Sequence, residues 1–317
     1  MHMNMNDVGI KTGVIWYLLS RKVALSLIIV ATLFVCSNLY AQNYELEEID
    51  NQKTDSIKAN WRKPNYLPIN QSEILENFRK EPSFGIFHDN YFITGVPINK
   101  EINNSTADVK FQISIRQLLF KKLLPRNQIL ALTYTQKSFW NIYEKSAPFA
   151  DNNYNPGLLL TKPIIHNGTL IGLSSIAFEH ESNGREDGID NRSCNYFVLT
   201  GVYFFNELFS TQIKIWGGWL TDENKDLFSR YRGNGLIAIN YRSQNDRFWC
   251  SAVINPRDRF KSYNTQMEVN YKTSNNSNQY IFLQWYNGYG ESLLEYNQYS
   301  SMIRVGICIK PYLRNYF

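Results

Sequence analysis

The sequence predicts an all-β protein: a twelve-stranded antiparallel transmembrane β-barrel, preceded by a cleaved signal peptide. Three observations lead to this fold class. An apolar run follows basic residues near the amino end, about twelve later segments alternate apolar and polar residues, and 15% of the residues are aromatic, 21 of them Tyr. Tyr rings are apolar with a polar tip and suit a membrane interface. The 19% of charged residues excludes a polytopic helical membrane protein, but not a barrel, whose inner face is polar.

The amino end is expected to be an export signal. Three basic residues precede an apolar run at 23–35, and "SNLYAQ" provides a cleavage site after Ala41, so 1–41 is the predicted signal peptide. An uncleaved membrane anchor is the alternative, although the apolar run is short for a transmembrane helix. Residues 42–84 lack alternation and include "NWRKPNYLPINQ". They are expected to form an irregular segment ahead of the barrel domain, 85–317.

Charge and cysteine content argue against two further classes. Removing the signal peptide takes away three basic residues and Asp7, which lowers the net charge from +5 to +3. With no basic run or basic helix, this gives no reason to expect nucleic acid as a partner. Cys194, Cys250 and Cys308 remain, an odd number without metal-ligand spacing. We expect them to be packing residues rather than a disulfide framework.

From residue 85 onward the dominant period is two. In "KFQISIRQLL", Phe111, Ile113 and Ile115 share one face of a strand, while the polar residues between them share the other. The expected strands lie near 87–97, 108–118, 128–138, 156–163, 169–182, 195–205, 211–220, 234–242, 247–254, 265–272, 279–287 and 302–309. Segments of this length separated by turns are typical of a membrane barrel, and the terminal Phe317 also fits one. A soluble β-sandwich, which would show similar alternation, is the alternative.

A possible catalytic trio lies at the end of one predicted strand, in "FEHESNGREDGIDNRSCNYF" (178–197). Along 169–182 the even positions form an apolar row that starts at Leu170 and ends with His180 and Ser182. In a barrel this face points to lipid. Because the next strand begins at Asn195 and returns antiparallel beside the first, all three side chains can meet on the outer wall.

These residue types can carry out acyl transfer. His180 can take the proton from Ser182, whose hydroxyl then attacks an ester carbonyl, provided that a third group fixes the imidazole tautomer. The Asn195 oxygen can supply that orientation, and a neutral amide avoids the cost of desolvating a carboxylate at a lipid boundary. The structural alternative is common, since His, Ser and Asn often occur near turns without any catalytic role.

The motifs "HESNG" and "RSCN" resemble the active-site signature of the bacterial outer-membrane phospholipase A family. "TYTQKSFW" (133–140), "SAPFADNNYNP" (146–156) and "NGYGESLLEYN" (287–297) also look like family segments, in the family's order. The resemblance spans roughly 85–317. It implies a twelve-stranded barrel in the outer membrane of a Gram-negative bacterium that hydrolyses acyl esters of membrane phospholipids, with A1 and A2 activity.

Carried over by residue, the resemblance implies that Ser182 is the nucleophile, His180 the base and Asn195 the orienting amide. Gly184 matches the residue whose backbone N–H helps to bind the oxyanion. The residue before Asn195 departs from the family pattern, because Cys194 stands where a Trp is expected. This change is not expected to abolish the chemistry.

The resemblance also implies a calcium cofactor and an active homodimer. The calcium ligands would be the Arg185 carbonyl, the Asn191 side chain and Ser146 of the partner subunit, with Asp187 as a further candidate. The loop before Asn195 is one residue longer than in the family, which leaves Asp190 and Ser193 open as alternatives to Asn191. Gln136 matches a polar residue of the family's dimer interface, and an inward, pore-lining position is its alternative.

Two rivals to a calcium-dependent phospholipase A remain at this stage. One is a non-catalytic barrel, either a narrow porin or a structural protein, in which His180 and Ser182 lie in the aromatic belt. The other is an enzyme relic that has kept the fold and lost turnover. The intact "HESNG" argues against decay, and twelve short segments argue for a narrow, filled barrel.

Overall fold

The computed structural model describes residues 82–120, 127–186, 188, 190–206, 208–220, 227–245, 247–274 and 277–311. The predicted signal peptide, nearly all of the predicted irregular segment 42–84, and Phe317 lie outside the described residues. Within the described part of the chain, no helix is both long and apolar enough to cross a membrane.

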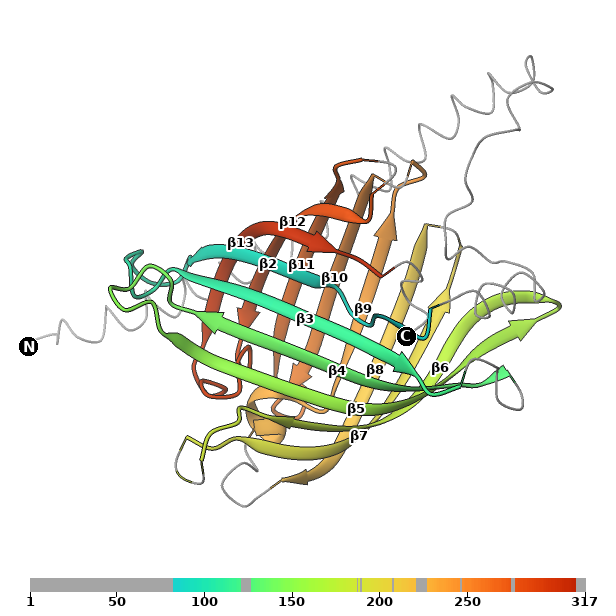
Figure 1. Ribbon diagram of the computed structural model, residues 1–317, viewed down its shortest axis with the longest axis horizontal. Helices are drawn as coiled ribbons and strands as arrows, with labels where there is room; N and C mark the ends of the chain where they lie inside the picture. The colour runs from blue at the N-terminus through green and yellow to red at the C-terminus, as the bar shows by residue number, and fades with distance from the viewer. Residues whose placement is uncertain are drawn as a thin grey trace, which may run out of the picture. The chain divides into compact units, whose positions relative to one another are not determined.

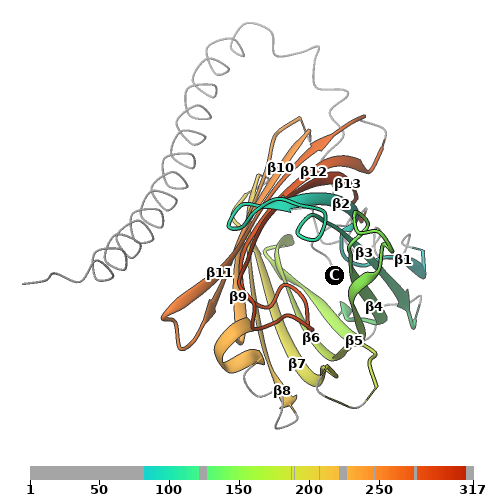
Figure 2. The same cartoon turned by 90° about the vertical axis from the view of Figure 1, so that its left-hand side faces the viewer.

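The described residues form a closed antiparallel sheet (Figures 1 and 2). Its strands are β1 (Phe84–Ile86), β2 (Asn90–Pro97), β3 (Asp108–Leu118), β4 (Ile129–Trp140), β5 (Phe149–His166), β6 (Thr169–Ser182), β7 (Ser193–Phe204), β8 (Phe209–Leu220), β9 (Gly235–Arg242), β10 (Phe248–Arg257), β11 (Ser262–Lys272), β12 (Gln279–Gly288) and β13 (Ser300–Ile309). A short π-helix, η3 (Leu227–Arg232), precedes β9. From β2 to β13 each strand pairs with the next, and β13 pairs with β2. The predicted twelve-stranded barrel is therefore confirmed.

The short strand β1 was not predicted, and it starts at the last residue of the segment expected to be irregular. It pairs with Ile115–Gln117 of β3, whereas β2 pairs with the earlier part of β3. The two strands therefore lie end to end beside β3. Between them, the Phe87 amide still donates to the Ser114 carbonyl at 3.1 Å, so the sheet keeps a hydrogen bond across the break.

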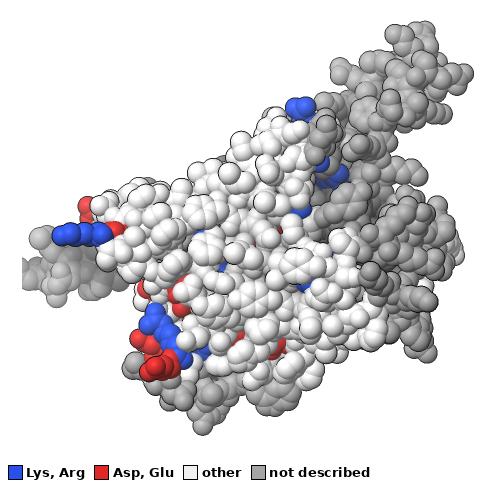
Figure 3. All heavy atoms as spheres, in the orientation of Figure 1, with Lys and Arg blue, Asp and Glu red and all other residues white. Residues whose placement is uncertain are grey.

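The alternation predicted from the sequence sorts polar residues inward and apolar residues outward. In β3, Lys110 is 2% exposed, whereas Ile113 is 48% exposed. In β13, the Arg304 side chain is buried between the exposed Ile303 and Val305. This arrangement is the reverse of a soluble sandwich and suits a wall that faces lipid. Figure 3 shows one side of that wall as a broad area with few charged side chains, while a cluster of charged groups stands at the left end of the view.

The prediction is wrong for one residue of the outward row, Leu170. Leu170 is fully buried, within an interior apolar cluster that also contains Leu118 and Leu173. The register explains this, because Ile165 pairs with Leu170 and Ile164 pairs with Gly172, which leaves one β6 residue unpaired. Such a bulge reverses the facing of the strand. Beyond it the expected facing holds, with Ile176 and Phe178 exposed.

Strand β5 is longer than predicted, beginning at Phe149 rather than near residue 156. Its first residues, "FADNNYN", are rich in Asp and Asn, which are depleted in strands. The inward positions Asp151 and Asn153 are nevertheless buried. They accept hydrogen bonds from the backbone amides of Leu294 and Leu293, at 2.9 Å and 3.2 Å, so the polar side chains are paired inside the barrel.

Aromatic side chains border the outer wall, as expected for a membrane barrel. At the end carrying the β7–β8 turn, three neighbouring ring pairs have centroids 4.9–5.1 Å apart: Tyr203 with Phe205, Phe209 with Tyr241, and Phe248 with Tyr271. At the opposite end, Trp140 stacks on Phe149 with ring centroids 5.3 Å apart.

The barrel interior is filled by an ion-pair network. The segment between β12 and β13 turns into the barrel (Figure 2) and carries Glu291, whose carboxylate lies 2.7 Å from Arg304 and 3.0 Å from Lys110. Arg304 also binds both carboxylate oxygens of Asp108 at 2.7 Å. All four side chains are largely buried. This packing argues against an open pore and places Glu291 of "NGYGESLLEYN" in the core.

Candidate active site

His180 and Asn195 lie opposite each other on β6 and β7. His180 Nδ1 and Asn195 Oδ1 are 2.8 Å apart. Because an amide oxygen only accepts hydrogen bonds, Nδ1 must carry the proton. This tautomer leaves Nε2 with a free electron pair, which is the form that a general base requires.

Ser182 lies two residues beyond His180, on the same outer face of β6. A strand rises about 3.3 Å per residue, so the two Cα atoms are roughly 7 Å apart and their side chains lean over the same patch of wall. Ser182 pairs with Tyr154 of β5 on one side and Ser193 of β7 on the other. The structure therefore brings the three predicted catalytic residues to one place, on the exterior of the barrel.

Gly184 is the second residue of the β6–β7 connection and has a φ of +65°, a conformation that glycine adopts without the strain of a side chain. A Cβ at this position would lie 2.8 Å from Cε2 of Tyr154. Both facts require glycine here. They also fix the path of the backbone directly after Ser182, where the predicted oxyanion donor lies.

Replacing Gly184 with alanine is expected to lower hydrolysis about ten- to hundredfold, because alanine is strained at this positive φ and its Cβ would press on the Tyr154 ring, and relief of both moves the backbone amide. The measurement is the initial rate on a fluorogenic phospholipid. Gly201→Ala is the matched control, since a Cβ there meets no atom within 4 Å. Equal rates for the two variants would remove Gly184 from the site.

Asn183, which the sequence reasoning missed, closes the loop that follows Ser182. Its side chain donates to the Asp190 carbonyl at 2.7 Å and accepts from the Arg192 amide at 3.0 Å. Its own amide donates to the Arg192 carbonyl at 2.9 Å. The residue is buried, so the loop 183–192 is fixed at both ends by one side chain.

The predicted calcium donors of this loop are oxygen atoms, which calcium prefers. Arg185 is exposed, with its guanidinium 3.2 Å from the Ala150 carbonyl and 3.6 Å from the Asp190 carboxylate. Asn191 lies near the other end of the loop, where its amide donates to the Gly188 carbonyl at 3.1 Å. Asp187 lies outside the described residues. Ser193, the other alternative, opens β7 opposite Ser182.

The donor set fits calcium because backbone carbonyl and side-chain amide oxygens are hard ligands. Among the residues that the structure describes, no group of three or more His, Cys, Asp or Glu side chains is close enough to hold a metal. The ligands predicted for the 183–192 loop are the Arg185 carbonyl and the Asn191 side chain, and the further candidate, the Asp187 carboxylate, lies outside the described residues.

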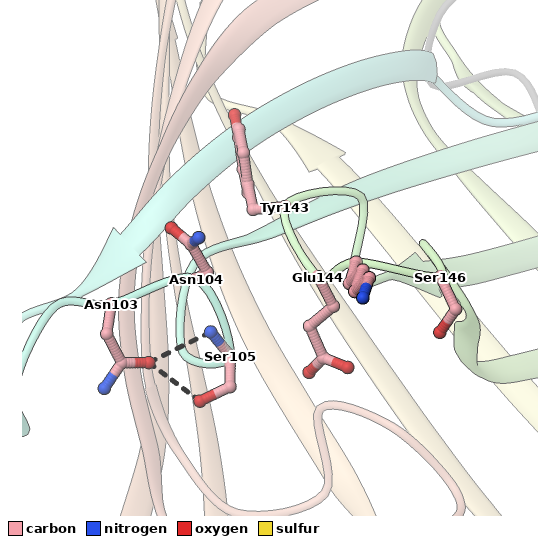
Figure 4. Close-up of a pocket in the computed structure, with 7 residues that line it drawn as sticks. Asn103, Asn104, Ser105, Tyr143, Glu144 and Ser146 are labelled. Atoms are coloured by element: carbon pink, nitrogen blue, oxygen red, sulfur yellow. Dashed lines mark hydrogen bonds between the residues drawn. The ribbon is translucent and has the colours of Figure 1, made fainter.

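Ser146 lies on a different loop, the β4–β5 connection. It is exposed and lines an open recess of about 670 Å³ between the β2–β3 and β4–β5 connections (Figure 4). The other lining residues are Asn103, Asn104, Ser105, Tyr143, Glu144 and Lys145. Exposure of Ser146 at the rim is compatible with its predicted role as a ligand toward a second subunit.

Gln136 lies on the outer wall, which rules out its alternative as a pore-lining residue. It pairs with the exposed Ile113 of β3 and with Tyr154 of β5. Its side chain accepts a hydrogen bond from Tyr134 at 3.2 Å and donates to Ser138 at 3.1 Å. These residues form a polar stripe along the outer face of β4, beside exposed apolar side chains such as Ile113 and Leu132.

Beneath the trio, inside the barrel, lies a second group that the sequence reasoning missed. Glu181, between His180 and Ser182 in sequence, points inward and accepts a hydrogen bond from the Tyr196 hydroxyl at 2.8 Å. Arg232 of η3 forms an ion pair with the same carboxylate oxygen. One signal was available: an acidic residue at an inward position of a strand needs a cationic partner within the barrel.

In the described part of the chain, Cys194, Cys250 and Cys308 carry thiols that are not joined in disulfides. Cys194 is buried and its thiol lies 3.7 Å from the Glu181 carbonyl. The residue that replaces the family's Trp therefore packs on the inner side of the sheet, away from the outer wall that carries the trio.

Comparisons with known proteins agree with this geometry. The phospholipase A1 family profile matches residues 88–309. Over 219 residues the chain is 30% identical to phospholipase A1 of Escherichia coli strain K12. The matched region covers 65% of this chain and 71% of that protein. The Proteus vulgaris phospholipase A1 is 28% identical over 228 residues, with the same coverage of 65% and 71%.

Two solved structures are similar as well. The outer membrane phospholipase A of Escherichia coli superposes with a TM-score of 0.63 at 26% identity, covering 72% of this chain and 99% of that one. The Salmonella typhi outer membrane phospholipase dimer with bound calcium gives 0.65 at 25% identity, covering 75% and 98%. With a family profile over most of its length and the same closed barrel, this chain belongs to the phospholipase A1 family and lies in the outer membrane of a Gram-negative bacterium.

Proposed function

We propose that this phospholipase cleaves acyl esters of membrane phospholipids with Ser182, His180 and Asn195, giving a lysophospholipid and a free fatty acid. The observation that carries the proposal is the hydrogen bond between His180 and Asn195, on the lipid-facing wall and beside a serine of the same strand. The substrate therefore meets the reacting groups without leaving the membrane.

The proposed reaction has two steps. His180 Nε2 removes the proton from Ser182 Oγ, which attacks the acyl carbonyl, and the imidazolium then protonates the departing lysophospholipid oxygen. A water molecule, deprotonated by the same nitrogen, releases the fatty acid and restores Ser182. Throughout, Asn195 Oδ1 holds the Nδ1 proton, and the Gly184 amide donates to the negatively charged oxygen of each tetrahedral intermediate.

The proposed cofactor is calcium, held by the Arg185 carbonyl and the Asn191 side chain, with Asp187 as a further ligand. When bound, calcium would supply positive charge beside the forming oxyanion. The oxygen-rich donor set supports this assignment, and the similar Salmonella typhi phospholipase has bound calcium.

The proposed active state is a homodimer in which Ser146 of the partner subunit completes the ligand set. A polar stripe on a lipid-facing wall supports pairing, because buried amides and hydroxyls can hydrogen-bond with their copies across a two-fold axis. Gln136 lies at the centre of that stripe. The similar Salmonella typhi protein is a dimer.

The test is phospholipid hydrolysis by the full chain, refolded in detergent and separated into monomer and crosslinked dimer. We expect turnover in the dimer with calcium and a loss of at least about a hundredfold on chelation, because one oxyanion-stabilising charge is commonly worth this much. After chelation, calcium or strontium, which also prefers oxygen ligands, is added back, and the hydrolysis rates recovered with the two ions are compared. Full activity of a strictly monomeric, chelated sample would contradict both the calcium and the dimer proposals.

A further inference from the structure

The hydrogen-bond ladder between β5 and β6 is interrupted beside His180. The paired residues on either side of the gap are Gly157 with Glu179 and Tyr154 with Ser182. At the same register, Pro156 lies opposite His180. Proline has no amide N–H, so it cannot donate to the strand beside it.

The missing donor is the one that would bond the His180 carbonyl. The Asn183 amide donates to Arg192 at 2.9 Å, so the backbone of Asn183 is directed toward the β7 side. Backbone groups of successive strand residues point to opposite sides, so those of His180 are directed toward β5. Its carbonyl therefore faces Pro156, the one residue type without a donor.

The side chain of Asn155 takes the place of the missing amide. Its Nδ2 lies 3.2 Å from the His180 carbonyl oxygen and 3.1 Å from the Tyr196 hydroxyl. An amide nitrogen has two hydrogens, which is the number needed for these two bonds. Asn155 occupies an inward position of β5, so the donor reaches the strand from inside the barrel.

Asn155 is itself held in place by buried groups. The Tyr196 hydroxyl that accepts its hydrogen bond donates to Glu181, and Arg232 of η3 binds the same carboxylate. Tyr196 and Glu181 are 3% and 5% exposed. A chain of contacts therefore runs from η3, through the barrel interior, to the backbone of the catalytic strand.

We propose that Asn155 is a positioning residue for His180, supplying the backbone donor that Pro156 lacks and so fixing the imidazole on the outer wall. The proposal rests on the proposed function. Asn155 lies on the opposite face of the sheet from the reacting groups and does not touch substrate. Its loss should therefore change the rate of the chemical step and leave substrate binding unchanged.

The test uses the full refolded chain and a fluorogenic phospholipid in mixed micelles. Asn155→Ala should lower kcat about ten- to hundredfold with KM unchanged, since a misplacement of about 1 Å can have an effect of this size. Adding Pro156→Ala to that variant should restore most of the rate, because residue 156 then offers a backbone N–H to the His180 carbonyl. Such rescue is not expected if Asn155 only fills space.

Asn240→Ala is the matched control. Asn240 is a buried inward asparagine of β9, bonded to Ser251 at 2.7 Å, and it makes no contact with β5 or β6 in the pairing of the sheet. Its loss should affect stability alone and leave kcat unchanged. An unchanged kcat in Asn155→Ala, or a loss that Pro156→Ala does not restore, would overturn the proposal.

A second measurement separates this proposal from the proposed function. The Nδ1 proton of His180 in the hydrogen bond to Asn195 can be followed by NMR whether or not the protein turns over. We expect its resonance to shift in Asn155→Ala and to return in the double variant. If the parent chain has no turnover, the proposed function fails, while the NMR result still decides the role of Asn155. An unmoved resonance would contradict that role.

Discussion

Replacing Ser182 with alanine is expected to lower phospholipid hydrolysis at least about a thousandfold, because no other group of the trio can form the acyl intermediate. The barrel should remain folded, since Ser182 is the last residue of β6 and lies on the outer wall. The measurement is turnover of a fluorogenic phospholipid with calcium present, beside the urea midpoint of the refolded barrel.

The chain offers a close control for this substitution. Ser174 is an exposed residue of the same strand, on the same outer face and eight positions away, so Ser174→Ala should retain full activity. Adding His180→Ala to Ser182→Ala should cause no further large loss, because residues that act as one unit are not additive. Turnover that survives Ser182→Ala would mean that another nucleophile carries the reaction.

Replacing Glu291 with glutamine is expected to destabilise the barrel by about 3–5 kcal/mol, since it leaves the buried Arg304 and Lys110 without their shared anion. Urea unfolding of the refolded protein measures the effect. Glu295→Gln is the control within the same connection, because Glu295 is exposed. Equal stability of the two variants would mean that the interior network contributes little.

The same carboxylate predicts how stability depends on pH. Burial raises the pKa of Glu291, but the adjacent Arg304 and Lys110 cations outweigh it and lower the pKa from 4.5 to about 2. A lowered pKa means that the stabilisation is complete above about pH 5 and is lost as the pH falls from 4.5 toward 2. The corresponding free energy is about 3 kcal/mol. Glu291→Gln should lack this part of the acid dependence.

Most of the fold could be predicted because a membrane barrel carries its pattern in single strands. Alternation in β3 and β13 shows which side chains face lipid without knowledge of their neighbours. The errors occurred where a local rule fails. The bulge that turns Leu170 inward depends on the register with β5, and the polar start of β5 is stabilised by amides of a connection more than a hundred residues away.

The catalytic trio could be predicted because it also depends on a pattern local to the sequence. His180, Ser182 and Asn195 come from adjacent strands whose pairing follows from a single hairpin. Asn155 and Arg232 could not be assigned, because their roles depend on where side chains meet across the barrel interior. Pro156 was a sequence sign of the gap that Asn155 fills, but it stood at the start of the predicted strand 156–163, where a proline is allowed.

The outward position of Ser182 has a consequence for the kinetics. An enzyme that meets its substrate on its own lipid-facing wall has no entrance tunnel, so a pore diameter cannot select the substrate. The rate at Ser182 therefore depends on the mole fraction of phospholipid in the surrounding membrane or micelle, and not on the amount of phospholipid per litre of solution. Inert amphiphile added at a constant total amount of substrate therefore acts as a diluent in two dimensions, and rates are comparable only at matched surface composition.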